Sequence, residues 1–298
     1  TPLTAIAQDI TVQLDSNGLA TIAAADVDNG SGSGCNSTPT LSIDISSFNC
    51  DDIGSNTVTL TVTDGTNTET ATATVTVVDN LNPNVLTQDI TVQLDANGQA
   101  IIAPLDIDNG SSDNCTIASL TLDKTSFNCS DLGPNTVTLS ITDGSGNIST
   151  GTTTVTITDN IDPVATTQDI TIQLDASGNA TINPTDIDNG SSDNCSITSI
   201  ALDTSSFSCA ELGQNTVTLT VTDTSGNTAM ATAVVTVQEN PNQQLTASAQ
   251  DISVQLDANG LATIAAGDVD NGSGSGCNST PTLSLDVSSF DCSDLGAN

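Results

Sequence analysis

Residues 135–158, which read NTVTLSITDGSGNISTGTTTVTIT, decide the fold class of this chain. From residue 136 to residue 142, Thr or Ser alternates with Val, Leu and Ile, and residues 152–158 alternate in a similar way. Residues 144–147, Gly-Ser-Gly-Asn, turn the chain between these two segments. An alternation with a period of two predicts β-strands with one buried face. The predicted inward-facing residues are Val137, Leu139, Ile141, Val155 and Ile157.

The residues before this segment supply further short strands. Residues 89–94, 99–103 and 117–122 are rich in Ile, Val, Leu and Thr. Residues 95–98, Asp-Ala-Asn-Gly, predict a hairpin turn because Asn-Gly tolerates positive φ, and residues 106–115 predict a polar loop. No window has the 3.6-residue period of a helix. Six or seven short strands in about 80 residues predict a β-sandwich.

The same pattern recurs along the whole chain. QDITVQLD begins at Gln8, Gln88 and Gln168, and QDISVQLD begins at Gln250, so the pattern returns at intervals of about 80 residues. We therefore predict an all-β chain of tandem sandwich repeats that form an extended rod. The predicted repeats are residues 1–79, 80–159, 160–240 and 241–298, the last one without its final two strands.

The charge composition excludes some classes of function. The chain has 36 acidic residues and one basic residue, Lys124, so it lacks the basic patch that nucleic-acid binding requires. It contains no His, Trp or Tyr, which removes the usual general base and the usual zinc ligand. No apolar run approaches the length of a membrane-spanning helix. No signal segment opens the chain, so any secretion signal is expected to lie outside this sequence or to have been removed.

The eight cysteines occur two per repeat, and thin cores of small side chains favour disulfides as additional support. Periodicity favours disulfides within each repeat. The two cysteines of a pair are then separated by roughly 14 or 15 residues, and closing such a loop stabilises the fold by about 3 kcal/mol. A metal site of cysteines would need four convergent ligands or His. Disulfides also indicate an oxidising, extracellular compartment. The predicted pairs are Cys35 with Cys50, Cys115 with Cys129, Cys195 with Cys209, and Cys277 with Cys292.

Two acidic patterns are candidate Ca²⁺ sites. The first is the Asp-x-Asp-Asn-Gly loop, since carboxylate and amide oxygens around a glycine turn suit Ca²⁺. Asx turns that cap the same loop are an equally weighted alternative. The predicted loop ligands are Asp26, Asp28, Asp106, Asp108, Asp113, Asp186, Asp188, Asp193, Asp268 and Asp270. The second pattern is the Pro-containing linker between repeats, where an ordinary linker is the alternative and the predicted ligands are Asp79, Asp159 and Asp162.

Every candidate carboxylate pair recurs in several repeats. An enzyme seldom needs its active site several times in one thin sandwich, so we predict no catalytic activity.

Three motifs together resemble the hyalin-type (HYR) Ig-like repeats of very large secreted proteins of Bacteroidota. They are the VTDTSGN turn at residues 221–227, the closing T-V-T-[IV]-x-[DE]-N strand, and the D-x-D-N-G-S-x-D-N-C loop. The resemblance covers all 298 residues and implies an Ig-like fold. It also implies a giant bacterial surface adhesin, such as a gliding-motility adhesin exported by type IX secretion and anchored to the outer membrane or released.

These observations support three hypotheses. The leading one is a stalk segment of a cell-surface or released adhesin that gives reach and stiffness, and whose partners are the neighbouring repeats. The second is a sheath, matrix or surface-layer fibre assembled from many copies. The third is an accessory stalk of a secreted enzyme, which requires a catalytic domain outside this sequence.

Overall fold

The computed structural model describes residues 2–33, 38–240, 246–274, 277 and 281–296. The chain divides into two compact units, Thr1–Asp159 and Asn160–Asn298. Unit 1 contains the first two sequence repeats and unit 2 contains the last two. The four repeat boundaries stay a prediction from the sequence period.

Each complete repeat is built on one long antiparallel hairpin. In repeat 1 the hairpin extends on both sides into a sheet of order β1-β6-β5-β3, with β1 parallel to β6. A second sheet pairs β2 with β4. A helical turn, α1, follows β2, and a 3₁₀ turn, η1, follows β4. The bounds are Ile10–Gln13 (β1), Leu19–Thr21 (β2), Ala24–Val27 (α1), Thr40–Ile43 (β3), Ser47–Asn49 (β4), Cys50–Asp52 (η1), Gly54–Thr63 (β5) and Thr68–Val78 (β6).

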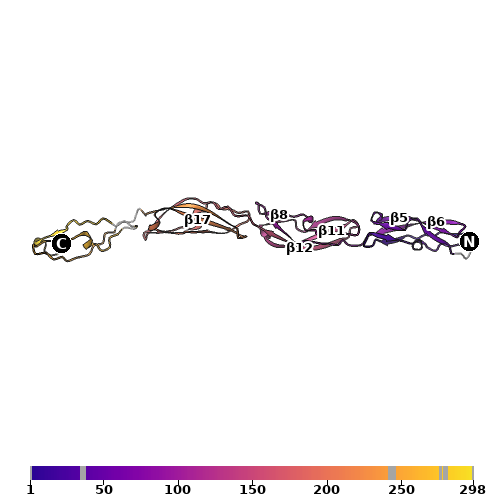
Figure 1. The fold of residues 1–298 in the computed structure, drawn as a ribbon, viewed down its shortest axis with the longest axis horizontal. Coiled ribbons are helices and arrows are strands. Elements are labelled where there is room, and N and C mark those ends of the chain that lie inside the picture. The colour runs from indigo at the N-terminus through magenta and orange to yellow at the C-terminus, as the bar shows by residue number, and fades with distance from the viewer. Residues whose placement is uncertain (1, 34–37, 241–245, 275–276, 278–280, 297–298) are drawn as a thin grey trace. The chain divides into compact units, whose positions relative to one another are not determined.

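Repeat 2 has the same topology, with sheets β7-β12-β11-β9 and β8-β10, and β11 and β12 are labelled in Figure 1. Its elements are Ile90–Gln93 (β7), Gln99–Ile101 (β8), Pro104–Ile107 (α2), Ile117–Leu122 (β9), Ser126–Asn128 (β10), Cys129–Asp131 (η2), Gly133–Asp143 (β11) and Ile148–Thr158 (β12).

Repeat 3, in unit 2, forms sheets β13-β18-β17-β15 and β14-β16. Its elements are Ile170–Gln173 (β13), Asn179–Thr181 (β14), Pro184–Ile187 (α3), Ile197–Leu202 (β15), Ser206–Ser208 (β16), Cys209–Glu211 (η3), Gly213–Asp223 (β17) and Thr228–Gln238 (β18). The described part of repeat 4 has only Ala262–Thr263 (β19), Ala266–Val269 (α4), Ser289–Phe290 (β20) and Cys292–Asp294 (η4).

The cores follow the alternation of the sequence. The predicted inward-facing residues of β11 and β12 are buried, with exposed fractions of 0 to 2%. One Phe per complete repeat is buried beside them, at Phe48, Phe127 and Phe207. The fold is therefore the predicted all-β array of tandem Ig-like β-sandwich repeats.

Two local predictions for repeat 2 are wrong. Residues 95–98 do not close a hairpin, because β7 pairs with β12 and β8 pairs with β10, so the turn carries the chain from one sheet to the other. The polar loop begins with the helical turn α2, which has Pro104 in its first turn and buries Ile107. A single turn is too short to show a 3.6-residue period.

Candidate cation site at the junction of two repeats

The disulfides join successive repeats. In unit 1, Cys50 bonds to Cys115, 65 residues further along, with 5.6 Å between their Cα atoms. In unit 2, Cys209 bonds to Cys277, 68 residues further along. The predicted pairing within each repeat is therefore wrong for these four cysteines. The regular repeat of the sequence is equally compatible with both pairings, so it does not distinguish them.

The position of each cysteine explains the pairing across repeats. Cys50 opens η1 at the end of repeat 1's second sheet, while Cys115 ends the polar loop of repeat 2. Both pack against the hydrophobic core of repeat 1. Cys277 is likewise buried against the core of repeat 3, together with Cys209. The first cysteines of repeats 2 and 4 therefore pack against the core of the repeat before them.

The remaining cysteines differ in state. Cys129 and Cys195 are disulfide-bonded as well. Cys292 is an exposed free thiol, contrary to its predicted bond with Cys277. Cys35 lies outside the described residues.

A glycine permits the close approach at the junction in unit 1. Gly18 has a φ of +74°, and a Cβ at this position would lie 2.7 Å from the Asn114 carbonyl oxygen and 2.7 Å from the Cys50 sulfur. The turn that contains Gly18 therefore contacts both the disulfide and the loop of repeat 2.

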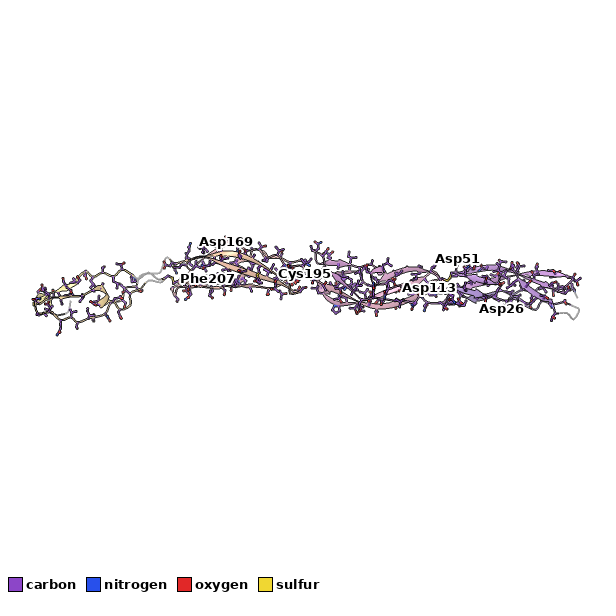
Figure 2. The ribbon with its side chains drawn as sticks, viewed as in Figure 1. Asp26, Asp51, Asp113, Asp169, Cys195 and Phe207 are labelled. Atoms are coloured by element: carbon purple, nitrogen blue, oxygen red, sulfur yellow. A yellow bond between two sulfur atoms is a disulfide. The ribbon has the colours of Figure 1, made fainter. Side chains whose placement is uncertain are left out.

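Three carboxylates meet at this junction. Asp79, Asp113 and Asp143 each offer one oxygen, and these oxygens all lie within 4.8 Å of one another. Asp79 follows β6 of repeat 1, Asp113 lies in the polar loop of repeat 2, and Asp143 ends β11. Asp79 is 4% exposed and Asp143 is 2% exposed. Figure 2 shows Asp113 where repeats 1 and 2 meet, apart from Asp26.

Hydrogen bonds fix the orientation of Asp143. Its Oδ1 accepts from the backbone N–H of Ser145 (2.9 Å) and of Asn147 (2.7 Å). Its Oδ2 accepts from Nδ2 of Asn147 (2.7 Å), which also donates to the backbone oxygen of Asp79 (3.1 Å). One asparagine therefore connects two of the three acidic residues across the junction.

The other two carboxylates are only half satisfied. Asp79 Oδ1 accepts from the Leu81 N–H (3.1 Å) and from Asn114 Nδ2 (3.2 Å), and Asp113 Oδ2 accepts from the Cys115 N–H (3.0 Å). Asp79 Oδ2, Asp113 Oδ1 and Asn114 Oδ1 are buried without a hydrogen-bond partner. Leaving a buried acceptor unsatisfied costs about 1–3 kcal/mol, and more when it is charged.

The donor set fits Ca²⁺. This ion binds six to eight oxygens at about 2.3–2.6 Å, so ligands on opposite sides of it lie about 4.8 Å apart. Three carboxylates and the Asn114 amide oxygen are hard ligands of this kind. Zinc would require His or Cys, but the chain has no His, and Cys50 and Cys115 are bonded to each other. The only base of the chain, Lys124, pairs with Asp131 at 2.6 Å.

The structure brings together one predicted loop residue, Asp113, and one predicted linker residue, Asp79. The first two acids of the loop are not part of the cluster. Asp106 Oδ2 accepts from the Ala103 N–H (2.7 Å) and caps α2, and Asp108 Oδ1 accepts from the Ser111 N–H (3.1 Å). The other repeats use Asp26, Asp28, Asp186, Asp188, Asp268 and Asp270 in the same way.

Unit 2 repeats part of this arrangement. Asp193 Oδ2 accepts from the Cys195 N–H (2.9 Å), its Oδ1 is buried without a partner, and Asp223 is 2% exposed. In the sequence, Asp159, Asp193 and Asp223 are the equivalents, one repeat later, of the three residues of the unit 1 cluster. Asp162 is exposed.

Asp143 is not among the predicted ligands, although the sequence contains a signal for it. The alternation that buries residues 137, 139 and 141 places Asp143 on the same inner face. Val75 and Val77 place Asp79 inward in the same way. A charged residue at the last inward position of a strand was the signal.

No protein-family model matches this sequence, and neither does any curated protein. The chain is similar to a three-Ig segment of titin with an E-to-A mutation, at 7% identity and a TM-score of 0.37, over 79% of this chain and 98% of that one. It is also similar to cadherin domains 1–4 of protocadherin gamma B7, at 11% identity and a TM-score of 0.32, over 85% and 80%. The human desmocollin-1 ectodomain is a third, at 11% identity and a TM-score of 0.29, over 88% and 66%.

These scores are all below 0.5, so the fold rests on the strand pairing described above. Within the described residues, no helix is both long enough and apolar enough to span a membrane.

Proposed function

We propose that this chain is a non-catalytic stalk segment of a cell-surface or released adhesin, in which Ca²⁺ and disulfides fix successive repeats to one another. The observation that carries the proposal is the Cys50–Cys115 bond, which ties repeat 1 to repeat 2 at the junction where three carboxylates cluster. A covalent bond between repeats limits how far they can move apart, which suits a stalk that must keep its length.

The disulfides indicate an oxidising compartment, and an extracellular structural or adhesive role agrees with tandem Ig-like repeats. The resemblance to hyalin-type repeats supports the narrower proposal of a bacterial surface adhesin, of the gliding-motility type exported by type IX secretion.

The proposed Ca²⁺ ligands are Asp79, Asp113, Asp143 and the amide oxygen of Asn114. The ion would supply positive charge where buried acidic oxygens have no donor, and it would connect the end of repeat 1 with two parts of repeat 2. An ion that binds the folded chain but not the unfolded chain stabilises the fold by about 2.7 kcal/mol at a free ion concentration of 100 Kd.

The test is Ca²⁺ titration by calorimetry on the full chain with its disulfides intact, together with thermal melts with and without EDTA. We expect stoichiometric heat and a lower Tm in EDTA. Asp113→Asn should reduce both effects, whereas Asp162→Asn changes the net charge equally at an exposed position and should leave both unchanged. Absence of heat together with an unchanged melt would overturn the Ca²⁺ part of the proposal.

The stalk is tested separately by sedimentation of the oxidised chain in millimolar Ca²⁺. A single stalk stays monomeric across the concentration range. Concentration-dependent growth into filaments would replace the stalk with the self-assembling fibre.

A further inference from the structure

The Cys50–Cys115 and Cys209–Cys277 disulfides each make a covalent shortcut around the longest strands of a repeat. The segment between Cys50 and Cys115 contains β5, β6, β7, β8 and α2. The segment between Cys209 and Cys277 contains β17 and β18. Each bypassed segment begins at the end of one repeat's short second sheet and ends at the polar loop of the next repeat.

We propose that these disulfides are mechanical bypasses, through which tension along the chain passes from one repeat to the next without stretching the central hairpins of repeats 1 and 3. Tension follows the shortest covalent path, because covalent bonds do not extend appreciably. The path from Cys50 to Cys115 spans 5.6 Å between Cα atoms through the sulfurs. The same 65 residues reach about 220 Å when extended.

The bypass protects the hairpin that supplies half of the buried core residues of repeat 1. Val58, Leu60 and Val62 of β5 are fully buried, and β6 adds Val75 and Val77. All five residues lie between the bonded cysteines, so tension does not act along their backbone. A pull on the two ends of the chain therefore extends, within repeat 1, only the residues before Cys50.

Without the bond the load takes a different route. The first strand, β1, pairs in parallel with the last strand, β6, so a pull on the two ends of the repeat shears this pair of four residues each. Once that pair fails, the hairpin lies in the load path and unfolds. The disulfide therefore determines whether this hairpin contributes to the extension of the chain.

The bypassed segment also contains two of the three clustered carboxylates, Asp79 and Asp113. Their backbone carries no tension while the bond is intact. The bypass nevertheless depends on the disulfide connectivity alone and stands whether or not an ion binds.

The experiment is single-molecule stretching of the full oxidised chain, held by peptide tags at its two ends. Cys50→Ser with Cys115→Ser should lengthen the fully unfolded chain by about 220 Å, the extended length of the released 65 residues. Cys209→Ser with Cys277→Ser should add about 230 Å, from 68 residues. Cys292→Ser is the matched control, because it removes an unbonded sulfur and should leave the length unchanged.

A second measurement keeps the proposal testable if a double variant does not fold. A soluble dithiol is added to the wild-type chain held under force. It donates two electrons and two protons to each disulfide, which becomes two thiols while the reductant closes into its own cyclic disulfide. Stepwise lengthening by about 220–230 Å is expected from segments of 65 and 68 residues. Equal unfolded lengths of the oxidised wild type and the double variants, or no steps on reduction, would overturn the proposal.

Discussion

The junction in unit 1 and the junction between repeats 3 and 4 in unit 2 share a disulfide but differ in their acidic residues. Cys50–Cys115 and Cys209–Cys277 close loops of similar length. Where the first junction has the buried Asp79, the second has Glu239, which is exposed. Where the first has Asp113, two positions before the cysteine, the sequence of the second has Ser275. The covalent link therefore does not require the carboxylate cluster.

The largest effect is expected from removal of a disulfide. Replacing Cys50 and Cys115 by Ser should destabilise unit 1 by about 4 kcal/mol, because the unfolded chain regains the freedom of a loop of 65 residues. Cys209→Ser with Cys277→Ser should destabilise unit 2 by about the same amount, since the loop lengths are similar. Denaturant unfolding followed by hydrogen exchange, resolved by segment, measures each unit separately. A much smaller loss at one junction would show that its bond strains the folded state.

The next largest loss of stability is expected at the close contact between Gly18 and the Cys50–Cys115 disulfide. Gly18→Ala forces a Cβ into the Asn114 oxygen and the Cys50 sulfur and also strains a positive φ, so we expect a loss of about 3 kcal/mol in unit 1.

Gly30→Ala is the matched control for the Gly18 substitution. Gly30 also has a positive φ, +88°, but nothing lies within 4 Å of its added Cβ. The loss at this position should therefore be limited to about 1 kcal/mol of backbone strain. Equal losses in the two variants, compared by denaturant unfolding, would contradict the close approach at the junction.

A third variant gives the first junction the serine that the second junction has at the equivalent position. Asp113→Ser should abolish the Ca²⁺-dependent stabilisation of unit 1, which is about 2.7 kcal/mol at a free Ca²⁺ concentration of 100 times the wild-type Kd. The disulfide should still form. Melts with and without EDTA measure the first effect, and a thiol assay measures the second. A variant that retains the full EDTA response would show that the ion binds elsewhere.

The strand periodicity made the sheets and their buried faces predictable. Val137, Leu139 and Ile141 could be assigned to the core because a period of two fixes the face of every residue. The same rule, extended by one step, would have placed Asp143 inward. The site itself combines Asp79 with Asp113 and Asp143, which lie far from it along the chain. Only packing between repeats brings such positions together, and a single sequence does not show it.

The disulfide pairing could not be predicted for a related reason. Cys50 follows Cys35 within its own repeat and also precedes Cys115 of the next repeat, and the other repeats preserve both relationships approximately. The sequence alone favours the shorter loop. The structure places the cysteine at the start of η1 next to the following repeat, so local position and not loop length decides the partner.

The smallest predicted effect is one that the two units should share. Hydrogen bonds from the Gln99 and Asn97 N–H groups lower the pKa of Asp95 below its usual value of 3.8, and equivalent turns lower the pKa of Asp15 in unit 1 and of Asp257 in unit 2. Because the folded-state pKa lies below the unfolded-state pKa, this stability is fully present above about pH 4 and is lost as the pH falls further.

In buffer from which Ca²⁺ has been removed, both units should therefore lose stability in parallel on acidification below about pH 4. Asp95→Asn should flatten that loss in unit 1 only, as measured by segment-resolved hydrogen exchange at several pH values. In Ca²⁺, unit 1 should lose stability more steeply on acidification than it does without Ca²⁺, because protons also compete with the ion for Asp79, Asp113 and Asp143. Identical acid profiles of unit 1 with and without Ca²⁺ would mean that the cluster of Asp79, Asp113 and Asp143 holds no ion.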